Sequence, residues 1–304
     1  MAKTIYLHIG THKTGSTSIQ RFLARADEAL ARQGILYPKT GRPTEGWSPY
    51  GQHKLQWAIT EGGKAAEKRI WEDLRQEISA HPGRRVVISA EEFERCTWEE
   101  IQKVVDHFDR YSLRVILYLR PPVQFLRAAY AQRVKMGEDI SFMQCVEEML
   151  PRCNYLNLVS RWEQCEKVES VAIRLFDKVK EEPGLEASFA EVVGIDFDKV
   201  RSFVGLPANT SPPVNVVRVI RWINRLENIG PNVDIWHELV NRARKNVLGR
   251  RWPGRWLARV GPPFLRDSVV TEEARKKVRN RLKCDHSMFL EKHVEDKNEK
   301  YLQI

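Results

Sequence analysis

The sequence has few cysteines, no long hydrophobic run and no low-complexity tract. Its five cysteines are odd in number and include no C-x-x-C pair, which argues against a zinc module and against a disulfide framework. No run of about 18 apolar residues occurs, and the first residues enter a strand pattern without a charged-then-apolar leader. We therefore expect a cytoplasmic protein whose fold depends on an apolar core rather than on cross-links.

Positive charge is in excess, with 50 Lys and Arg against 40 Asp and Glu and a formal net charge of +10. Such a balance favours anionic partners: nucleotide cofactors, acidic glycans, nucleic acid or an anionic membrane surface. The usual nucleic-acid recognition motifs are missing from the sequence, so we expect no nucleic-acid partner. The charge alone does not choose among the other anions.

One segment near the N-terminus reads as strand, turn and helix. Thr4 to Ile9 is a short β-branched and aromatic run typical of a buried strand, and Gly10 and Gly15 bound the turn after it. Gly34 stands where the C-cap of the following helix is expected. The helix itself is predicted by apolar residues at helical spacing, namely Ile19, Phe22, Leu23, Ala26 and Leu30. This arrangement directs backbone amides and a helix N-terminus at one point, so we interpret Gly10–Ser18 as an oxyanion cradle.

The cradle differs from the phosphate loop of ordinary nucleotide hydrolases. That loop reads G-x-x-x-x-G-K-[ST], with its lysine directly after the second glycine. Gly10 and Gly15 have the right spacing, but Ser16 follows Gly15 and the lysine is Lys13, inside the turn. The displaced lysine points its ammonium elsewhere, which disfavours a nucleotide hydrolase.

Three more apolar strands follow, separated by helical patterns, at Arg85–Ser89, Leu113–Leu119 and Ser170–Phe176. The sequence thus predicts an α/β fold with a parallel β-sheet flanked by helices, P-loop-like, and a mainly helical C-terminal extension. We expect residues 1–183 to form the α/β core and residues 184–304 the helical part, packed on the same domain. Since ligands of such sheets bind beyond the carboxyl ends of the strands, polar residues just past three strands should meet at one edge, namely Lys13, Glu91 and Arg120.

The segment IGTHKTGSTSIQ resembles the 5′-phosphosulfate loop of sulfotransferases that use 3′-phosphoadenosine 5′-phosphosulfate (PAPS). The resemblance implies a PAPS-dependent sulfotransferase whose product is 3′,5′-ADP and whose reaction requires no metal. It implies that Lys13 stabilises the leaving phosphate; the plain alternative is a solvated turn lysine. The resemblance also implies that the other residues of the loop bind the donor. These residues are Gly10, Thr11, His12, Thr14, Gly15, Ser16, Thr17 and Ser18.

A second stretch, LRPPVQFLRAAY, is similar to the family's 3′-phosphate motif at Arg120, Pro122 and Tyr130. It departs from that motif at Ala128, where the family has serine. Arg127 is the candidate to supply the missing hydrogen bond. An arginine such as Arg120 suits a 3′-phosphate site because its planar guanidinium binds phosphate through two parallel hydrogen bonds. The alternative role for Arg120 is a salt bridge at the strand end.

The acceptor hydroxyl needs a general base. Glu91 follows the second long strand, where relatives place a catalytic histidine or glutamate, and its neighbour Glu92 shares the ambiguity. His53 is the rival base, because it follows a flexible loop in a region that relatives use for the acceptor. The alternatives are a helix-start acid for Glu91 and a structural histidine for His53.

The sequence does not identify the acceptor: a carbohydrate, a lipid-linked saccharide, a small phenol and a peptide tyrosine all stay open, and the positive charge favours a carbohydrate or glycolipid. The resemblance implies transfer to a hydroxyl, with an amine as the lesser choice. The Arg- and Trp-rich stretch Arg250–Arg259 suggests peripheral membrane contact, and its alternative is a packed loop. Two other functions stay open: a P-loop small-molecule kinase, and a catalytically degenerate nucleotide-binding protein. Against the kinase, Glu91 is the one obvious carboxylate after a strand that could hold magnesium. The sequence does not indicate the oligomeric state.

Overall fold

The computed structural model describes residues 2–44, 49–205, 214–230, 234–248 and 270–304. The chain forms two compact units that interleave in sequence. The first comprises Met1–Arg120, Asn154–Ala208 and Cys284–Gln303; the second comprises Pro121–Cys153, Asn209–Lys283 and Ile304. The predicted boundary after residue 183 stays a prediction.

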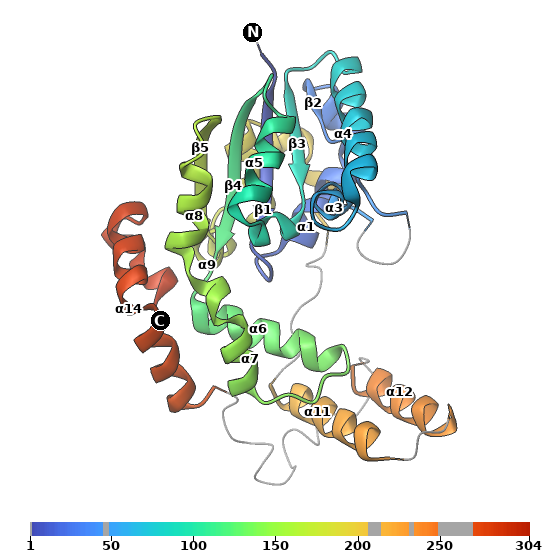
Figure 1. Cartoon of the computed structure of the whole chain (residues 1–304), viewed down its shortest axis with the longest axis vertical. Coiled ribbons are helices and arrows are strands. Elements are labelled where there is room, and N and C mark those ends of the chain that lie inside the picture. The colour runs from blue at the N-terminus through green and yellow to red at the C-terminus, as the bar shows by residue number, and fades with distance from the viewer. Residues whose placement is uncertain (1, 45–48, 206–213, 231–233, 249–269) are drawn as a thin grey trace. The chain divides into compact units, whose positions relative to one another are not determined.

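The first unit is built on a five-stranded sheet of order β2-β3-β1-β4-β5. Every neighbouring pair is parallel, and the strands lie side by side among helices (Figure 1). This confirms the predicted fold class. The strands are β1 (Thr4–Gly10), β2 (Ile35–Leu36), β3 (Arg85–Ser89), β4 (Ser112–Leu119) and β5 (Val168–Leu175). The sequence predicted four of them; β2 is the short extended piece after Gly34, and it pairs with β3 through only two residues.

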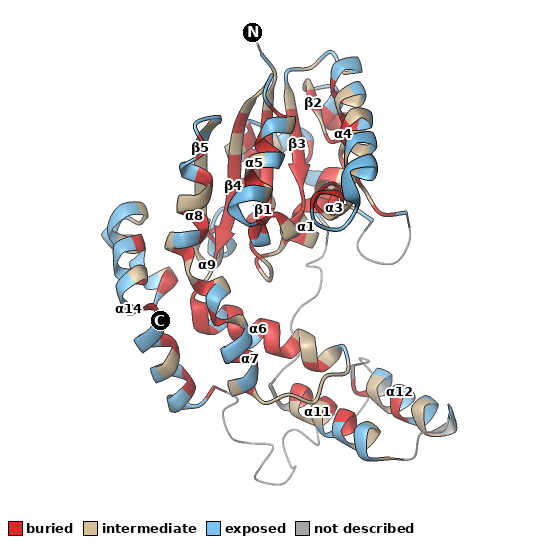
Figure 2. Ribbon diagram, in the orientation of Figure 1, coloured by how far each residue is buried: buried red, intermediate tan, exposed pale blue. Residues whose placement is uncertain are grey.

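Alternation along the strands divides the core of this unit between the two faces of the sheet. On β1, Ile5, Leu7 and Ile9 belong to one cluster of buried side chains, while Tyr6 belongs to another. The central strands are buried along most of their length, as Figure 2 shows, because helices cover both faces. The first cluster includes residues of α3 (His53–Thr60), α4 (Gly63–Ala80), α5 (Trp98–His107) and α8 (Tyr155–Glu163). The second includes residues of α1 (Ser16–Arg25), α2 (Asp27–Ala31) and α10 (Leu185–Val193).

Local sequence signals explain how these helices begin and end. Thr97 and Glu100 form a capping box at the start of α5, since each side chain bonds the other's backbone amide. Gly34, at φ 71°, ends the first helical segment as predicted, and its amide donates to the Ala31 carbonyl. That segment is interrupted at Ala26, so the predicted single helix is two, α1 and α2.

Short elements complete the first unit: η1 (Glu91–Arg95), α9 (Phe176–Glu181), η3 (Phe197–Lys199), η4 (Arg201–Phe203) and η6 (Asp296–Leu302). The described residues of the second unit form helices around their own apolar cluster, which includes Phe125, Tyr130 and Ile220. Its elements are α6 (Pro122–Lys135), α7 (Phe142–Met149), η2 (Leu150–Cys153), α11 (Val214–Ile229), α12 (Asp234–Leu248) and the first half of α14 (Glu272–His293). Among the described residues, every helix is too short or too polar to cross a membrane.

Candidate functional site

The loop between β1 and α1 takes a conformation that its two glycines permit. Gly10 has φ +104° and Gly15 has φ +84°, both in the region that L side chains rarely adopt. A Cβ at Gly10 would lie 3.2 Å from the backbone of Glu91, so the glycine lets β1 pass close to η1. A Cβ at Gly15 would lie 2.3 Å from Leu185 Cδ2, which has the same effect against α10. Both glycines are therefore favoured by φ, and Gly10 also by its close approach to the Glu91 backbone, whereas the Leu185 side chain beside Gly15 can move.

Hydroxyl groups hold the loop in shape. Thr11 Oγ1 donates to the Tyr118 carbonyl of β4 at 2.9 Å, and Thr14 Oγ1 donates to the Thr11 carbonyl at 2.5 Å. Ser16 Oγ reaches the same carbonyl at 3.4 Å. The amides of Ser16 and Thr17 open α1 and have no acceptor within that helix, which leaves them available to an anion in front of it. That this loop binds an oxyanion stays a prediction.

The structure brings Arg120 to this loop from the end of β4. Arg120 Nη1 donates to the Lys13 carbonyl at 3.0 Å, which joins the two sequence motifs at one point. Its guanidinium also lies over the Phe176 ring and 3.8 Å from Asp177 Oδ1. The salt bridge considered as the alternative role is therefore present together with the loop contact. Lys13 itself sits at φ 65°, at the tip of the turn.

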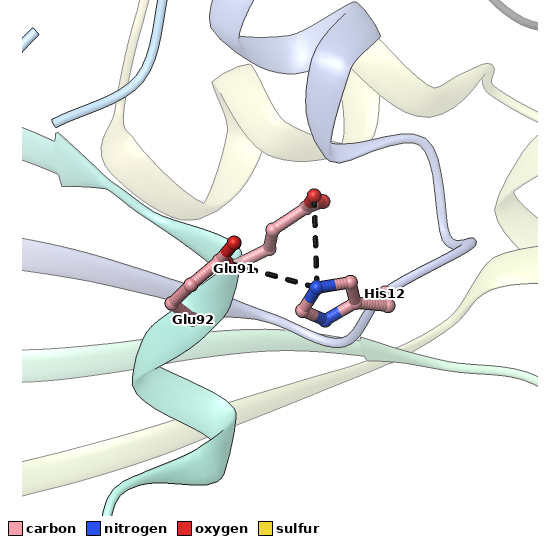
Figure 3. A group of neighbouring side chains, drawn as sticks. All are labelled: His12, Glu91 and Glu92. Atoms are coloured by element: carbon pink, nitrogen blue, oxygen red, sulfur yellow. Dashed lines mark ion pairs between the residues drawn. The ribbon is translucent and has the colours of Figure 1, made fainter. Parts of the chain in front are cut away.

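An acidic group lies on the other side of the loop, where β3 passes into η1. His12 Nε2 faces Glu91 Oε1 at 3.8 Å and Glu92 Oε2 at 3.7 Å (Figure 3). The other ring nitrogen, Nδ1, lies 2.8 Å from Glu94 Oε1, and the His12 backbone amide donates to Glu94 Oε2 at 3.1 Å. Among the described residues, His12, Glu91 and Glu92 form the group whose ligand atoms are close enough to hold a metal ion, all within 4.8 Å of one another.

The structure places His53 beside this group, so both candidate bases lie in one neighbourhood. His53 opens α3 and is fully buried, with Nδ1 4.0 Å from Glu92 Oε2. Neither ring nitrogen has a hydrogen-bond partner among the described residues. Burial lowers the pKa of His53, and the charge of Glu91 opposes that shift in part. A neutral imidazole accepts a proton or a cation through its one ring nitrogen that carries no hydrogen, which is Nδ1 or Nε2 depending on the tautomer.

Buried polar residues support the site from beneath the sheet edge. His8 Nδ1 lies 2.8 Å from Ser89 Oγ, and Gln20 Nε2 donates to the same oxygen at 3.2 Å. All three residues are essentially inaccessible to solvent, and burial lowers the pKa of His8 to about 3. These contacts fix the end of β3, from which η1 and Glu91 continue.

Other predicted residues are bonded elsewhere or belong to the second unit. Ser18 Oγ donates to Glu186 Oε1 at 2.7 Å, so its hydroxyl proton is committed to a carboxylate. Arg127 is exposed on α6, in the second unit, and its role toward the 3′-phosphate stays a prediction. Ala128, which replaces the family serine, is buried on the same helix. The stretch Arg250–Arg259 lies outside the described residues.

Sequence reasoning missed Glu94 and Asp177. Glu94 follows Glu91 by three residues, and side chains three residues apart eclipse one another in a 3₁₀ helix. A 3₁₀ helix over the run EEFER would therefore have predicted that Glu94 lies on the same side as Glu91. Asp177 follows β5 in the same way that Arg120 follows β4, at the neighbouring strand end. The rule that gathered Lys13, Glu91 and Arg120 at one edge would also have included Asp177.

Comparisons with known proteins do not identify a family for this chain. No family model matches the chain, and no curated protein matches its sequence. Among solved structures, the crystal structure of a sulfotransferase from Alicyclobacillus acidocaldarius is similar over 78% of this chain and 100% of its own length. The two sequences are 15% identical and the TM-score is 0.44. The function proposed next therefore rests on the residues of the site.

Proposed function

We propose that this protein transfers a sulfuryl group from PAPS to a hydroxyl acceptor. The observation that carries the proposal is the 3.0 Å hydrogen bond from Arg120 to the Lys13 carbonyl, which joins the predicted 5′ and 3′ halves of the donor site. The Arg120 guanidinium thus meets the backbone of Lys13, three residues before the first amides of α1. A donor with anionic groups at both the 5′ and the 3′ position matches that distribution of charge.

The chemistry follows from the charges on the two sides of the loop. The acceptor oxygen attacks sulfur, and the bond from sulfur to the bridging phosphate oxygen breaks, which releases 3′,5′-ADP. Lys13 and the loop amides stabilise the negative charge that develops on the leaving phosphate. Glu91 takes the proton of the acceptor hydroxyl. His53 is the second candidate for that role, since it lies in the same acidic group.

The acceptor is proposed to be a carbohydrate or glycolipid hydroxyl, with an amine as the lesser choice. The formal charge of +10 favours an anionic acceptor or an anionic surface. Membrane contact through Arg250–Arg259 and a cytoplasmic location belong to the same proposal. Arg127 is proposed to bind the 3′-phosphate where the family serine is replaced by Ala128.

Thermal unfolding with a panel of nucleotides tests the donor site. A ligand at 100 times its dissociation constant adds about 2.7 kcal/mol to the free energy of unfolding, which is visible as a rise in Tm. We expect 3′,5′-ADP to raise Tm more than 5′-AMP, and Lys13→Ala to reduce the rise. Lys64→Ala, which changes an exposed lysine on α4, is the matched control and should leave the rise unchanged.

The same panel tests the two alternative functions. The P-loop kinase has one observation in its favour, the carboxylates of Glu91 and Glu92 beside the loop, which magnesium prefers as ligands. It predicts a Tm rise with ATP and magnesium and none with 3′,5′-ADP, which would overturn the sulfotransferase. A catalytically degenerate protein predicts binding of 3′,5′-ADP but no transfer from PAPS to any member of a hydroxyl-acceptor screen.

A further inference from the structure

Glu94 holds His12 between three carboxylates. Glu94 is nearly inaccessible, and its two oxygens lie at hydrogen-bond distance from the backbone amide and the Nδ1 atom of His12. The Nε2 atom of His12 is on the side of Glu91 and Glu92. A carboxylate that orients a histidine so that its other nitrogen binds a metal is a common arrangement at metal sites.

The spacing of the three ligand atoms suits a metal ion. The Nε2 atom of His12 is 3.8 Å from Glu91 Oε1 and 3.7 Å from Glu92 Oε2, and no two ligand atoms are more than 4.8 Å apart. A point equidistant from three such atoms lies about 2.1 to 2.4 Å from each, which overlaps the bond lengths of divalent ions to nitrogen and oxygen. The distances from His12 Nε2 to the two carboxylate oxygens are too long for hydrogen bonds. A cation between the three atoms would interact with each of them more strongly than they interact with one another.

An independent observation points to the same place. His53 is fully buried, neither of its ring nitrogens has a hydrogen-bond partner among the described residues, and Nδ1 is directed at Glu92 across 4.0 Å. A buried imidazole without partners costs free energy unless something binds it. It comes from α3, whereas the other three residues come from the β1–α1 loop and from η1.

We propose that His12, Glu91 and Glu92 bind a divalent first-row transition-metal ion, and that His53 completes the ligand set. Imidazole suits Zn²⁺ and Fe²⁺, and carboxylates suit Mn²⁺ and Mg²⁺, so the mixed set favours Zn²⁺, Fe²⁺ or Mn²⁺ over Mg²⁺. Glu94 is the positioning residue, because it acts on the ion through His12. The site adjoins the donor loop through His12, but the donor's cations, Lys13 and Arg120, are not among its ligands.

One consequence rests on the proposed function. The reaction proposed above requires no metal and uses Glu91 as the base. A metal ion on Glu91 removes that carboxylate from proton transfer, so the bound ion inhibits turnover. Since neither Lys13 nor Arg120 is a ligand, binding of 3′,5′-ADP continues when the ion is bound.

Titration of the metal-stripped protein with Zn²⁺, Mn²⁺ and Mg²⁺ tests the site without any nucleotide. We expect saturable one-to-one calorimetric binding of Zn²⁺ and Mn²⁺, and weaker binding of Mg²⁺. Glu92→Gln removes a ligand while conserving shape and should weaken Zn²⁺ binding by about 100-fold or more. Glu94→Gln should weaken it by about 10- to 100-fold, the usual effect of losing a residue that orients a metal-bound histidine.

Glu67→Gln is the matched control, because it also removes a carboxylate beside a histidine. Glu67 lies on α4, its Oε1 atom is 3.0 Å from His107 Nε2 on α5, and neither residue belongs to the proposed site. It should leave Zn²⁺ affinity unchanged. Co²⁺ supplies a second readout, since its visible spectrum should change on binding and change again in His53→Gln. Absence of saturable binding, or equal affinity in wild type, Glu92→Gln and Glu94→Gln, would overturn the proposal. Either result leaves the nucleotide panel free to support or reject the donor site.

Discussion

The two sides of the β1–α1 loop differ in charge and in how the chain assembles them. The cationic side consists of Lys13, Arg120 and the amides that open α1, and it is held by hydrogen bonds to the loop's own carbonyls. The acidic side consists of His12, His53 and three glutamates of η1, and it is held by side chains. The difference suggests a division of labour, with the donor bound on the cationic side and the proton accepted on the acidic side.

The largest expected effect is on the acidic side. Glu91→Gln keeps the size of the side chain but removes the proposed base, so turnover should fall by about 10²- to 10⁴-fold. Binding of 3′,5′-ADP should stay within twofold of wild type, because the donor's ligands are untouched. Initial rates with PAPS and calorimetry with 3′,5′-ADP measure the two quantities. Near-normal turnover in Glu91→Gln, together with loss of turnover in His53→Gln, would move the base to His53.

The next effect is on the cationic side. Lys13→Ala removes the charge that faces the leaving phosphate, so turnover should fall by about 10²- to 10³-fold. Unlike Glu91→Gln, it should also weaken binding of 3′,5′-ADP, because the proposal has the lysine contact the 5′ phosphate in the ground state. Steady-state rates and calorimetry on the same preparation separate the two variants. If Lys13→Ala left both quantities unchanged, the cationic side would have no role in donor binding.

Gly10 ends β1 at the start of the β1–α1 loop and packs against Glu91 of the acidic side, so a methyl group there should disturb both the loop and η1. Gly10→Ala combines a φ of +104° with a Cβ only 3.2 Å from the Glu91 backbone, so we expect a loss of stability of about 1–3 kcal/mol. Gly63→Ala is the matched control, since Gly63 has φ +65° but no atom within 4 Å of its Cβ position. Urea unfolding measures both variants. Equal losses would assign the whole effect to backbone conformation and none to the contact with Glu91.

The smallest effect concerns the buried support of the sheet edge. Burial lowers the pKa of His8 from 6.5 to about 3, so His8 stays neutral in the folded protein while the unfolded chain takes up a proton below pH 6.5. Stability contributed in this way is present above pH 6.5 and is lost as pH falls toward 3, at no more than about 1.4 kcal/mol per pH unit.

His8→Gln removes this proton uptake, so its free energy of unfolding should fall less steeply between pH 6.5 and 5 than that of wild type. Urea unfolding at several pH values gives both slopes. Identical slopes would mean that His8 is protonated in the folded protein. His286→Gln serves as a comparison. Burial lowers the pKa of that histidine as well, but His286 lies on α14 rather than at the sheet edge.

The sequence predicted the cationic side better than the acidic side, and the reason is physical. The β1–α1 loop is contiguous, and its glycines, hydroxyls and lysine occupy fixed positions in the turn, so spacing alone predicts where Lys13 lies. Arg120 follows from the rule that parallel strands end at one edge. The acidic side draws on the β1–α1 loop, η1 and α3, and no local spacing predicts that Glu94 bonds His12 or that His53 is buried beside Glu92.

The fold shows the same limit. Strands of five or more residues with apolar runs were predicted correctly, whereas β2 is two residues long and exists only because β3 pairs with it. The interruption between α1 and α2 at Ala26 was missed because the apolar spacing continues across it. Tertiary pairing and side-chain packing decide such details, and neither is encoded in a local pattern.

The most direct measurement of the central claim is the pair of dissociation constants for 3′,5′-ADP and 5′-AMP, determined by calorimetry in wild type and in Arg120→Gln. A charged hydrogen bond contributes about 1.5–3 kcal/mol, so Arg120 should make 3′,5′-ADP bind about 10- to 100-fold more tightly than 5′-AMP. The account predicts that Arg120→Gln removes this preference while 5′-AMP affinity stays nearly constant. Equal affinity for the two nucleotides in wild type would contradict a PAPS site at this loop.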